Sequence, residues 1–503
     1  MQQVSALPPV LLLLLLISLS SSSCCHGANA AAGDHHDFMV VPASSLLHLS
    51  QGAVCSGHKD DGLTAMPPHN RAAWVPINRP HGPCSSAGAM DNMVDNMLLW
   101  DQLRTSYILK ELSDSRAGKA VPTIDANAAP APPVVKQDSM MMEGNITMGP
   151  QPNVTCNARS SSMATSDAAR SGKPGVRQTV IIDTSSDITW VQCLPCPVPQ
   201  CHLQKDPLYD PADSTTYAPI PCGSRACKEL GSSYGNGCSG SGQCNYAVNY
   251  SDGRATTGTY ITDTLTLSDN TTSINGFRFG CSHADRGPFG DRTAGVLALG
   301  GGPQSLRAQA APTYGDAFSY CIPLPSSIGF LSLGGPPVGL LPRFVLTPLI
   351  RNPRAPTFYI VRLEAIAVSG KRLAVPPAAF AAGAVMDSNA VITQLPAVAY
   401  AALRAAFRSF MGAYPRAAPV LNLDTCYDFT RSPKVTLPKV SLVFAGGATV
   451  PLDAASIMLG GCLAFAAIPG NGSLGFIGNI QQQNYEVLYD VGGGSVGFRR
   501  GAC

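Results

Sequence analysis

Two aspartates, Asp183 and Asp387, occupy equivalent points of a weak internal repeat. Each follows two apolar residues, and each is followed at the fifth and sixth positions by Ile-Thr, at Ile188 and at Ile392. A carboxylate at the end of a buried strand is costly unless something compensates its charge. Two such turns related by lobe symmetry would bring the carboxylates face to face, where they share one proton. One carboxylate can then activate a water while the other protonates a carbonyl oxygen, which is the chemistry of peptide-bond hydrolysis.

The residues that follow each aspartate are those expected to support the pair. Backbone N–H groups of each turn, together with the Ser186 hydroxyl in the first copy, can donate to the carboxylates. The predicted catalytic residues are therefore Asp183 and Asp387. The predicted supporting residues are Thr184, Ser185, Ser186, Ser388 and Asn389.

The rest of the chain must form two lobes that hold the two aspartates close together. Its 503 residues exceed what one hydrophobic core usually organises, which predicts two lobes and further segments outside them. Glycine (49) and proline (42) are frequent, which favours many short strands joined by tight turns. The net charge of +2, without a run of basic residues, argues against nucleic acid as a partner.

Hydrophobic patterning predicts a mostly β protein with few helices. The expected helices cover residues 304–311 and 397–411, where apolar residues of the second can share one face. The expected strands cover residues 179–182, 246–250, 259–267, 277–279, 330–333, 359–368, 441–444 and 486–489.

The first 31 residues have the pattern of a secretory signal. An apolar stretch of about ten residues is too short to span a bilayer and precedes a small-residue tract, although a basic residue before it is missing. A buried terminal helix is the alternative. We expect export to the cell exterior or the vacuole, with no stable membrane span. Four glycosylation sequons, at Asn145, Asn153, Asn270 and Asn471, would be usable on that route.

Twelve of the 17 cysteines follow residue 190, and seven of these crowd into residues 193–244. In an exported protein such crowding predicts an insertion held by disulfides, although the pairing cannot be read from the spacing. Zinc is the alternative for Cys193 and Cys196, but a second paired ligand set is absent.

Residues 32–178 look peripheral to the globular core. A helix-like piece at 90–112 carries Met97, Leu98 and Ile108 near a 3.6-residue period, with Asp101, Arg104 and Lys110 expected on other faces. Residues 157–178 are rich in Ser, Ala and Gly and predict a linker, so that globular structure would start near residue 179.

Several motifs together resemble the pepsin-like aspartic peptidases, and in particular their cysteine-rich, nepenthesin-like plant branch. The motifs are Asp183-Thr184-Ser185-Ser186-Asp187 with Trp190-Val191-Gln192-Cys193, Tyr250-Ser251-Asp252-Gly253, Phe318-Ser319-Tyr320-Cys321, Leu423-Asp424-Thr425-Cys426-Tyr427 and Ile477-Gly478-Asn479-Ile480-Gln481-Gln482. The stretches Asn78-Arg79-Pro80-His81-Gly82-Pro83-Cys84 and Asp101-Gln102-Leu103-Arg104 are similar to that branch's prosegment.

The resemblance implies a bilobal β fold with a central cleft. It divides the chain into a signal peptide (1–31), a prosegment and linker (32–178), an N-terminal lobe with the cysteine-rich insertion (179–335) and a C-terminal lobe (336–503). Tyr250, Asp252 and Gly253 would form a mobile flap over a polypeptide substrate. The implied protein is a monomer that needs no metal and no cofactor, and its partners are the substrate and its own prosegment.

The aromatic and histidine residues have other interpretations. Tyr250 has the alternative of a core tyrosine at a strand end, and Trp190 is better explained as core near the first aspartate than as a substrate contact. The histidines, such as His202 and His283, lack the partners that a serine or cysteine peptidase needs.

The chain departs from the family pattern at three positions and in one segment. Ser185 and Asn389 stand where the family has glycines, and their side chains could crowd the aspartates. Ala390 replaces a hydroxyl residue that would support Asp387. The hairpin before the first motif looks truncated. Two functions stay open: a secreted aspartic endopeptidase weakened by its second motif, and a silent homologue that binds a polypeptide or an enzyme in the old cleft. A structural storage role is the third.

Overall fold

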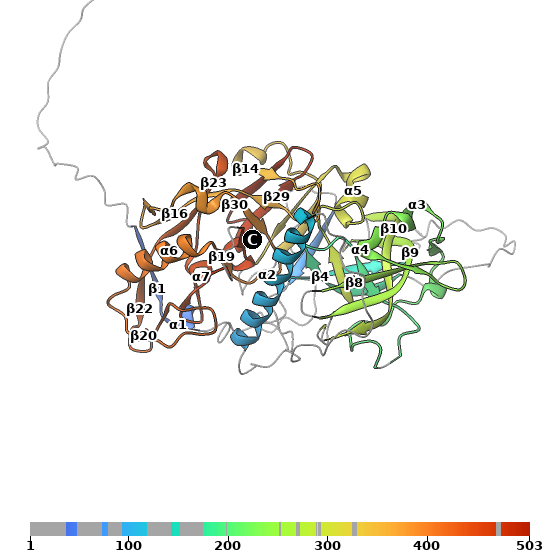
Figure 1. Cartoon of the computed structure of the whole chain (residues 1–503), viewed down its shortest axis with the longest axis horizontal. Helices are drawn as coiled ribbons and strands as arrows, with labels where there is room; N and C mark the ends of the chain where they lie inside the picture. Colours follow the sequence, from blue (N-terminus) through green and yellow to red (C-terminus); the bar gives the residue numbers. More distant parts are fainter. Residues whose placement is uncertain are drawn as a thin grey trace, which may run out of the picture. The chain divides into compact units, whose positions relative to one another are not determined.

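The computed structural model describes residues 37–47, 73–78, 93–117 and 142–150, and then 175–503. Short gaps interrupt the last range at 198, 251–252, 268–271, 288, 290–292, 324–328 and 469–473. Within these residues strands dominate, in agreement with the predicted mostly β fold (Figure 1).

The N-terminal lobe is built on β4 (Val176–Asp183) and the long hairpin of β9 (Ala255–Thr266) and β10 (Ser273–Arg286). β8 (Cys244–Asn249) pairs antiparallel with β9 and extends this sheet. β5 (Trp190–Gln192) pairs with β10, and β11 (Gly295–Ala298) lies parallel to β4. The Asp183 turn therefore leaves a strand that is held inside the sheet.

The C-terminal lobe repeats that arrangement around the second aspartate. β18 (Ala384–Met386) runs parallel to β28 (Gly475–Ile477), as β4 does to β11. β19 (Thr393–Leu395) pairs antiparallel with β28, as β5 does with β11. The predicted internal duplication is thus visible in the strand pairing of both lobes.

The hairpin before the first motif is complete, so the expectation of a truncated hairpin was wrong. β3 (Glu143–Met148) pairs antiparallel with β4 from Glu143 opposite Ile181 to Met148 opposite Val176. The prediction failed because residues 151–174 separate the two strands and hid the turn signal that normally joins a hairpin. β4 also starts at Val176, inside the stretch expected to be a linker.

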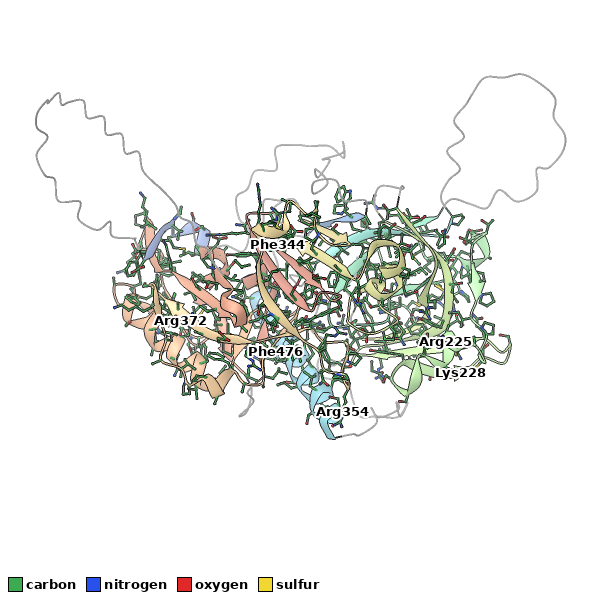
Figure 2. The ribbon with its side chains drawn as sticks, turned by 90° about the horizontal axis from the view of Figure 1, so that it is seen from above. Arg225, Lys228, Phe344, Arg354, Arg372 and Phe476 are labelled. Atoms are coloured by element: carbon green, nitrogen blue, oxygen red, sulfur yellow. A yellow bond between two sulfur atoms is a disulfide. The ribbon has the colours of Figure 1, made fainter. Side chains whose placement is uncertain are left out.

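Segments from the first 150 residues pack on both lobes. β1 (Phe38–Pro42) pairs with β22 (Lys434–Pro438), and β2 (Trp74–Asn78) pairs with β13 (Gly329–Leu333) and β3. The 25-residue helix α2 (Met93–Ala117) lies between the elements of the two lobes in Figure 1. Phe476, labelled beside α2 in Figure 2, belongs to one apolar cluster with Ile108 and Leu112 of that helix.

The predicted helices are present as α5 (Leu306–Tyr314), capped by the Ser305 hydroxyl, and α6 (Ala397–Phe410). The remaining helices are α1 (Ser44–Leu47), α3 (Arg225–Lys228), α4 (Gly231–Tyr234), α7 (Ala454–Ile457) and α8 (Asn479–Gln482), with 3-10 turns at Pro211–Asp213, Leu341–Arg343, Pro377–Phe380 and Ala445–Gly447. The remaining strands are β6 (Ala218–Pro219), β7 (Gly235–Cys238), β12 (Ala317–Cys321), β14 (Val345–Ile350), β15 (Ile360–Val361), β16 (Leu363–Val368), β17 (Lys371–Arg372), β20 (Arg416–Ala417), β21 (Cys426–Tyr427), β23 (Val440–Phe444), β24 (Thr449–Pro451), β25 (Met458–Leu459), β26 (Cys462–Leu463), β27 (Phe465–Ala467), β29 (Tyr485–Asp490) and β30 (Ser495–Arg500).

All twelve cysteines after residue 190 form disulfides. The pairs are Cys193–Cys281, Cys196–Cys201, Cys222–Cys238, Cys227–Cys244, Cys321–Cys503 and Cys426–Cys462. Four of them hold the cysteine-rich insertion, as predicted, and the pairing of Cys193 and Cys196 with other cysteines removes the zinc alternative. Among the described residues, no helix is long and apolar enough to cross a membrane.

Candidate active site

The two aspartates lie on turns of the same construction, one in each lobe. Asp183 ends β4 and Asp387 directly follows β18, and both side chains are buried. The Ser185 N–H donates to Asp183 Oδ1 at 2.9 Å, and the Asn389 N–H donates to Asp387 Oδ1 at 2.9 Å. Each carboxylate is thus oriented by the backbone two residues further on.

Thr184 and Ser388 bind the two turns to each other. The Thr184 N–H donates to Ser388 Oγ at 3.1 Å, and the Ser388 N–H donates to Thr184 Oγ1 at 3.0 Å. The Ser388 hydroxyl also donates to the Ile182 carbonyl in the opposite lobe. This reciprocal pairing fixes the two aspartates at one place on the lobe boundary.

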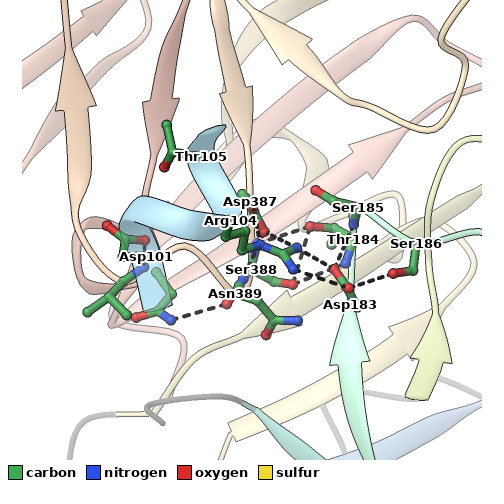
Figure 3. A network of polar contacts seen from close by, with 12 residues as sticks. Asp101, Arg104, Thr105, Asp183, Thr184, Ser185, Ser186, Asp387, Ser388 and Asn389 are labelled. Carbon is green, nitrogen blue, oxygen red and sulfur yellow. Dashed lines mark hydrogen bonds and ion pairs between the residues drawn. The ribbon is translucent and has the colours of Figure 1, made fainter. Parts of the chain in front are cut away.

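Arg104 of α2 lies between the carboxylates and contacts both (Figure 3). Its Nη2 donates to Asp183 Oδ1 at 2.7 Å and to Asp387 Oδ1 at 2.8 Å, and its Nε donates to Asp387 Oδ2 at 2.7 Å. Since one nitrogen reaches both carboxylates, their facing oxygens lie within about 6 Å of each other, the range of strong mutual influence. The guanidinium therefore occupies the space between the two carboxylates.

The charges of this cluster compensate one another. Burial raises the pKa of the Asp183 carboxyl, but the Arg104 charge and hydrogen bonds from Arg104, Ser186 and the Ser185 N–H outweigh it, so that the pKa lies below its ordinary value. Burial lowers the pKa of Arg104, and the two carboxylates more than reverse this, so the guanidinium stays charged. With α2 in place, Arg104 forms ion pairs with Asp183 and Asp387.

A second polar contact anchors α2 to the C-terminal lobe. Asp101 accepts from the Val391 N–H at 2.7 Å and from Gln394 Nε2 at 3.0 Å, and Gln394 Nε2 also donates to Thr105 Oγ1 at 2.7 Å. Burial raises the pKa of Asp101 to about 7, and the nearby Asp387 acts in the same direction, because the hydrogen bonds that Asp101 accepts do not offset the lost hydration.

Asp101 and Arg104 were expected away from the apolar face of the helix, and that placement was wrong. Both are buried, whereas Lys110 is exposed as expected. Asp101, Arg104 and Ile108 follow one another at spacings of three and four residues, so they share a face with Met97. Two charged residues inside an otherwise buried stripe were the signal that could have identified the contact with the aspartates.

The substitutions at the glycine positions leave both turns intact. Neither Ser185 nor Asn389 has a positive φ, so the backbone there does not require glycine. The Ser185 hydroxyl and Asn389 Oδ1 are buried with no hydrogen-bond partner among the described residues. Crowding by these side chains, which the sequence led us to expect, therefore does not displace the carboxylates.

The two turns differ in side-chain support. The Ser186 hydroxyl donates to Asp183 Oδ2 at 2.6 Å. At the equivalent position, the buried Ala390 provides only a methyl group. Asp387 therefore has one fewer donor than Asp183, as its sequence predicted.

The flap residues lie where β8 passes into β9. Tyr250 N donates to the Arg254 carbonyl at 2.8 Å, and Gly253, at φ 83°, closes the turn. The Tyr250 hydroxyl accepts from Trp190 Nε1 at 2.7 Å. Asp252 lies outside the described residues. Trp190 is fully buried, which agrees with its interpretation as a core residue, and Tyr250 is half-buried above it.

Asp187, which the sequence marked only as part of the first motif, connects three segments around the first turn. Its carboxylate accepts from Thr357 Oγ1 at 2.6 Å, from the Gly302 N–H at 2.8 Å and from the Tyr234 hydroxyl at 3.4 Å. Burial raises its pKa against these hydrogen bonds. Asp187 thus binds the first turn to the C-terminal lobe and to the cysteine-rich insertion.

The neighbours of the carboxylate oxygens at the site are hydrogen-bond donors. Among the described residues, no group of three or more His, Cys, Asp or Glu side chains is arranged to hold a metal. The carboxylate oxygens are instead used by the guanidinium and by N–H and hydroxyl donors.

Comparison with known families matches most of the globular part of the chain. Residues 168–335 match the family described as "Xylanase inhibitor N-terminal", and residues 358–500 match "Xylanase inhibitor C-terminal". The first matched range falls on the N-terminal lobe and the second on the C-terminal lobe.

Relatives with curated descriptions are aspartic proteases of plants. An aspartyl protease family protein of Arabidopsis thaliana is 35% identical over 443 residues, which cover 85% of this chain and 86% of the relative. The Arabidopsis protein "ASPARTIC PROTEASE IN GUARD CELL 2" is 39% identical, over 66% of this chain and 71% of its own. Nepenthesin-2 of Nepenthes gracilis is 32% identical, over 66% and 76%.

Solved structures share the fold at low sequence identity. Basic 7S globulin from soybean aligns with a TM-score of 0.54 at 17% identity, covering 73% of this chain and 93% of that one. The structure named edgp aligns with a TM-score of 0.53 at 19% identity, covering 71% and 91%.

Proposed function

Because the chain belongs to the plant family of pepsin-like aspartyl proteases, we propose that it is an aspartic endopeptidase made as a self-inhibited precursor. The observation that carries the proposal is the position of Asp183 and Asp387 on equivalent, mutually bonded turns with one guanidinium between them. A pair so placed has the geometry for proton-sharing chemistry once that guanidinium leaves.

The reaction follows from the surroundings of the two carboxylates. When Arg104 departs, Asp183 loses the charge that lowers its pKa, and the two buried carboxyls hold one proton between them. The ionised member takes a proton from a water that attacks the substrate carbonyl, and the protonated member donates to the carbonyl oxygen, which gives a tetrahedral diol. The C–N bond then breaks as one carboxyl donates its proton to the departing amine nitrogen and the other carboxylate takes a proton from a diol hydroxyl, so that the pair again holds one proton. The backbone donors at Ser185 and Asn389 keep both carboxylates oriented through this exchange.

The helix α2 acts as the inhibitory part of the prosegment. It covers the carboxylates with Arg104 and is anchored through Asp101 to the Val391 N–H and to Gln394. Acid releases it, because protonation of Asp183, whose pKa the docked Arg104 lowers, removes an ionic partner of Arg104. A secretory route to the cell exterior or the vacuole, with a signal at residues 1–31, fits both the disulfides and an acidic site of action.

A second function, that of a silent homologue that binds a polypeptide or an enzyme, is favoured by two observations. Ala390 withholds the hydroxyl that Asp387 would otherwise accept from, and the matched family descriptions name a xylanase inhibitor. The loss of one donor to a charged group is worth roughly 1.5–3 kcal/mol, which slows the reaction but leaves it measurable. We therefore favour a weakened enzyme over a silent binder.

The test is acid incubation of the purified precursor. Self-processing and cleavage of an unfolded protein substrate, both blocked by a statine-type inhibitor, are expected. Asp183→Asn, which keeps the shape of the side chain, is the matched inactive control. A precursor that binds the inhibitor but cleaves nothing at any pH supports the silent homologue instead.

A further inference from the structure

Asp187 lies at the far end of the turn that begins with Asp183, and it is 3% exposed. Its Oδ2 atom lies 2.6 Å from Thr357 Oγ1 of the C-terminal lobe, and its Oδ1 atom accepts from the Gly302 N–H at 2.8 Å. The Tyr234 hydroxyl of the cysteine-rich insertion approaches Oδ2 at 3.4 Å. One carboxyl group, four residues after Asp183, thus contacts both lobes.

The glycine loop, formed by Gly300, Gly301 and Gly302, lies against the Asp187 carboxyl group. A Cβ atom at Gly300 or at Gly302 would lie 2.3 Å from an oxygen of this carboxyl group, so only glycine permits such a close approach. Between them, the Gly301 N–H donates to the Thr357 carbonyl at 2.9 Å. Asp187, the glycine loop and Thr357 therefore form one continuous contact between the lobes.

The Asp183 turn is attached to the C-terminal lobe at two places. Thr184 and Ser388 hold the start of the turn, whereas Asp187 holds its end through Thr357. A turn that is fixed at one end can still pivot, but a turn that is fixed at both ends cannot. The contact of Asp187 therefore keeps the first carboxylate in place opposite the second, and small displacements of reacting groups are costly to the rate.

We propose that Asp187 is a positioning residue of the peptidase: in its protonated form it joins Thr357 to the glycine loop and thereby fixes the Asp183 carboxylate for reaction. The proposal rests on the proposed peptidase function and adds a second group whose protonation that function requires. Asp187 acts through the turn and takes no part in the proton transfers.

The contacts of Asp187 suit a protonated carboxyl group. Among the described residues no basic side chain pairs with it: Arg307 and Arg351 donate to a carbonyl of the glycine loop, and Arg307 also pairs with Asp316. A buried carboxylate without an ionic partner is costly. The distance between Asp187 Oδ2 and Thr357 Oγ1 fits a hydrogen bond in either direction, so a protonated Asp187 can donate to this hydroxyl.

The other titratable groups near Asp187 in the described part of the chain are two tyrosines and a glutamate. Tyr234 donates to it, Tyr107 of the docked α2 interacts with it, and Glu111 of that helix acts on Tyr234. Burial raises the pKa of Asp187 and outweighs the hydrogen bonds that it accepts and the charge of Arg307. Its contribution to the lobe contact is therefore complete below the ordinary aspartate pKa of about 4 and is lost as pH rises through the raised pKa.

The first experiment measures kcat and KM of the full-length protein after processing in acid. Asp187→Ala should lower kcat by about 10- to 100-fold with KM unchanged, as expected when a reacting group is misplaced. Asp187→Asn should keep most of the wild-type kcat, because its amide can accept from the Gly302 N–H and donate to Thr357 as a protonated carboxyl group does. Thr357→Val, which keeps the shape but loses the hydroxyl, should lower kcat as Asp187→Ala does. Asp428→Asn, which changes an exposed carboxylate of the C-terminal lobe, is the matched control and should behave as the wild type does.

The second experiment does not depend on cleavage. It follows hydrogen exchange of the Gly302 N–H, which donates to Asp187, in the full-length precursor between about pH 5 and pH 8. Protection, corrected for the intrinsic exchange rate, should fall as pH rises in the wild type and in Asp428→Asn. In Asp187→Asn, whose side chain cannot ionise, protection should depend less on pH.

The outcomes separate the positioning role from the peptidase function. An unchanged kcat in Asp187→Ala or Thr357→Val, or a loss in Asp187→Asn as large as that in Asp187→Ala, would overturn the positioning role and leave the peptidase standing. If Asp187→Ala does not fold, Thr357→Val and Asp187→Asn decide. If nothing is cleaved, the peptidase function fails and the exchange profile decides whether protonated Asp187 holds the turn. A pH dependence that Asp187→Asn reduces supports this, and a flat wild-type profile or one that Asp187→Asn leaves unchanged overturns it.

Discussion

The turns of Asp183 and Asp387 have the same backbone and different side chains, and they respond differently to substitution. Where the backbone N–H makes the contact, at Ser185 and Asn389, replacing the family's glycine leaves the hydrogen bond at 2.9 Å in both lobes. Where a side chain makes the contact, its replacement removes the donor, so Asp183 keeps the Ser186 hydroxyl and Asp387 has none from Ala390. The departures from the family pattern thus remove a hydrogen bond only at the position that would donate through its side chain.

The comparison predicts that the aspartates are equally indispensable although they are unequally supported. Asp183→Asn and Asp387→Asn should each lower acid proteolysis by at least about 10²- to 10⁴-fold, because each removes a proton donor or acceptor of the transition state. Cleavage rates of a peptide substrate on folded variants, verified by circular dichroism, measure this. If one variant keeps more than a tenth of the activity, that aspartate is not part of the reacting pair.

Removing Arg104 should remove the ion pairs of α2 with both aspartates at once. Arg104→Ala leaves two buried carboxylates without their counter-ion, a change worth about 3–5 kcal/mol in comparable buried pairs. Faster self-processing is expected, starting at a higher pH than in the wild type, and can be followed on gels. Lys110→Ala, on the exposed side of the same helix, is the control and should process as the wild type does.

Restoring the missing hydroxyl in the Asp387 turn should raise activity and so test the difference between the two turns. Ala390→Ser supplies the smallest side chain with a hydroxyl at a position that is 1% exposed, and activity should rise about tenfold or more. Ser186→Ala in the first turn should lower activity by a similar factor. Asn389→Gly is the contrasting variant, and little change is expected because the backbone already donates to Asp387. A larger gain from Asn389→Gly than from Ala390→Ser would reverse the account of the two turns.

The smallest effect concerns the pH dependence of α2 docking. Asp101 has its pKa raised to about 7 when docked, so its contribution to docking is complete below its ordinary pKa of about 4 and is lost as pH rises through 7. Asp183 has a lowered pKa, so its contribution is present above about 4 and is lost as pH falls further. Docking should therefore be strongest near pH 4 to 5.

Asp101→Asn tests this dependence, since it removes the titrating group and keeps an oxygen for the Val391 N–H. Hydrogen exchange of α2 amides should become less dependent on pH between about 4 and 7 in this variant, while the onset of acid release below 4 is unchanged. An unchanged exchange profile would show that Asp101 does not control docking in that range.

The two-lobed fold could be predicted from the sequence because, in each lobe, the residues of the repeat around the aspartate are neighbours in the sequence. Asp183, Asp387, Thr184 and Ser388 were identified as one cluster from their spacing, and the structure brings them together. The β3–β4 hairpin was missed because its strands are separated by residues 151–174. The role of Arg104 was missed because a charged residue on a helix is normally exposed, and only the distant carboxylates make its burial favourable.

The most direct test of the account is the pH profile of self-processing in the wild-type precursor and in Arg104→Ala. We predict that the wild type processes only in acid, that Arg104→Ala processes at higher pH, and that adding Asp183→Asn to either abolishes processing. The proposal of an active peptidase would be contradicted if neither the wild type nor Arg104→Ala processes itself or cleaves a substrate at any pH. This outcome counts only when α2 is shown to be released in Arg104→Ala. Processing that survives Asp183→Asn would show that other groups perform the hydrolysis.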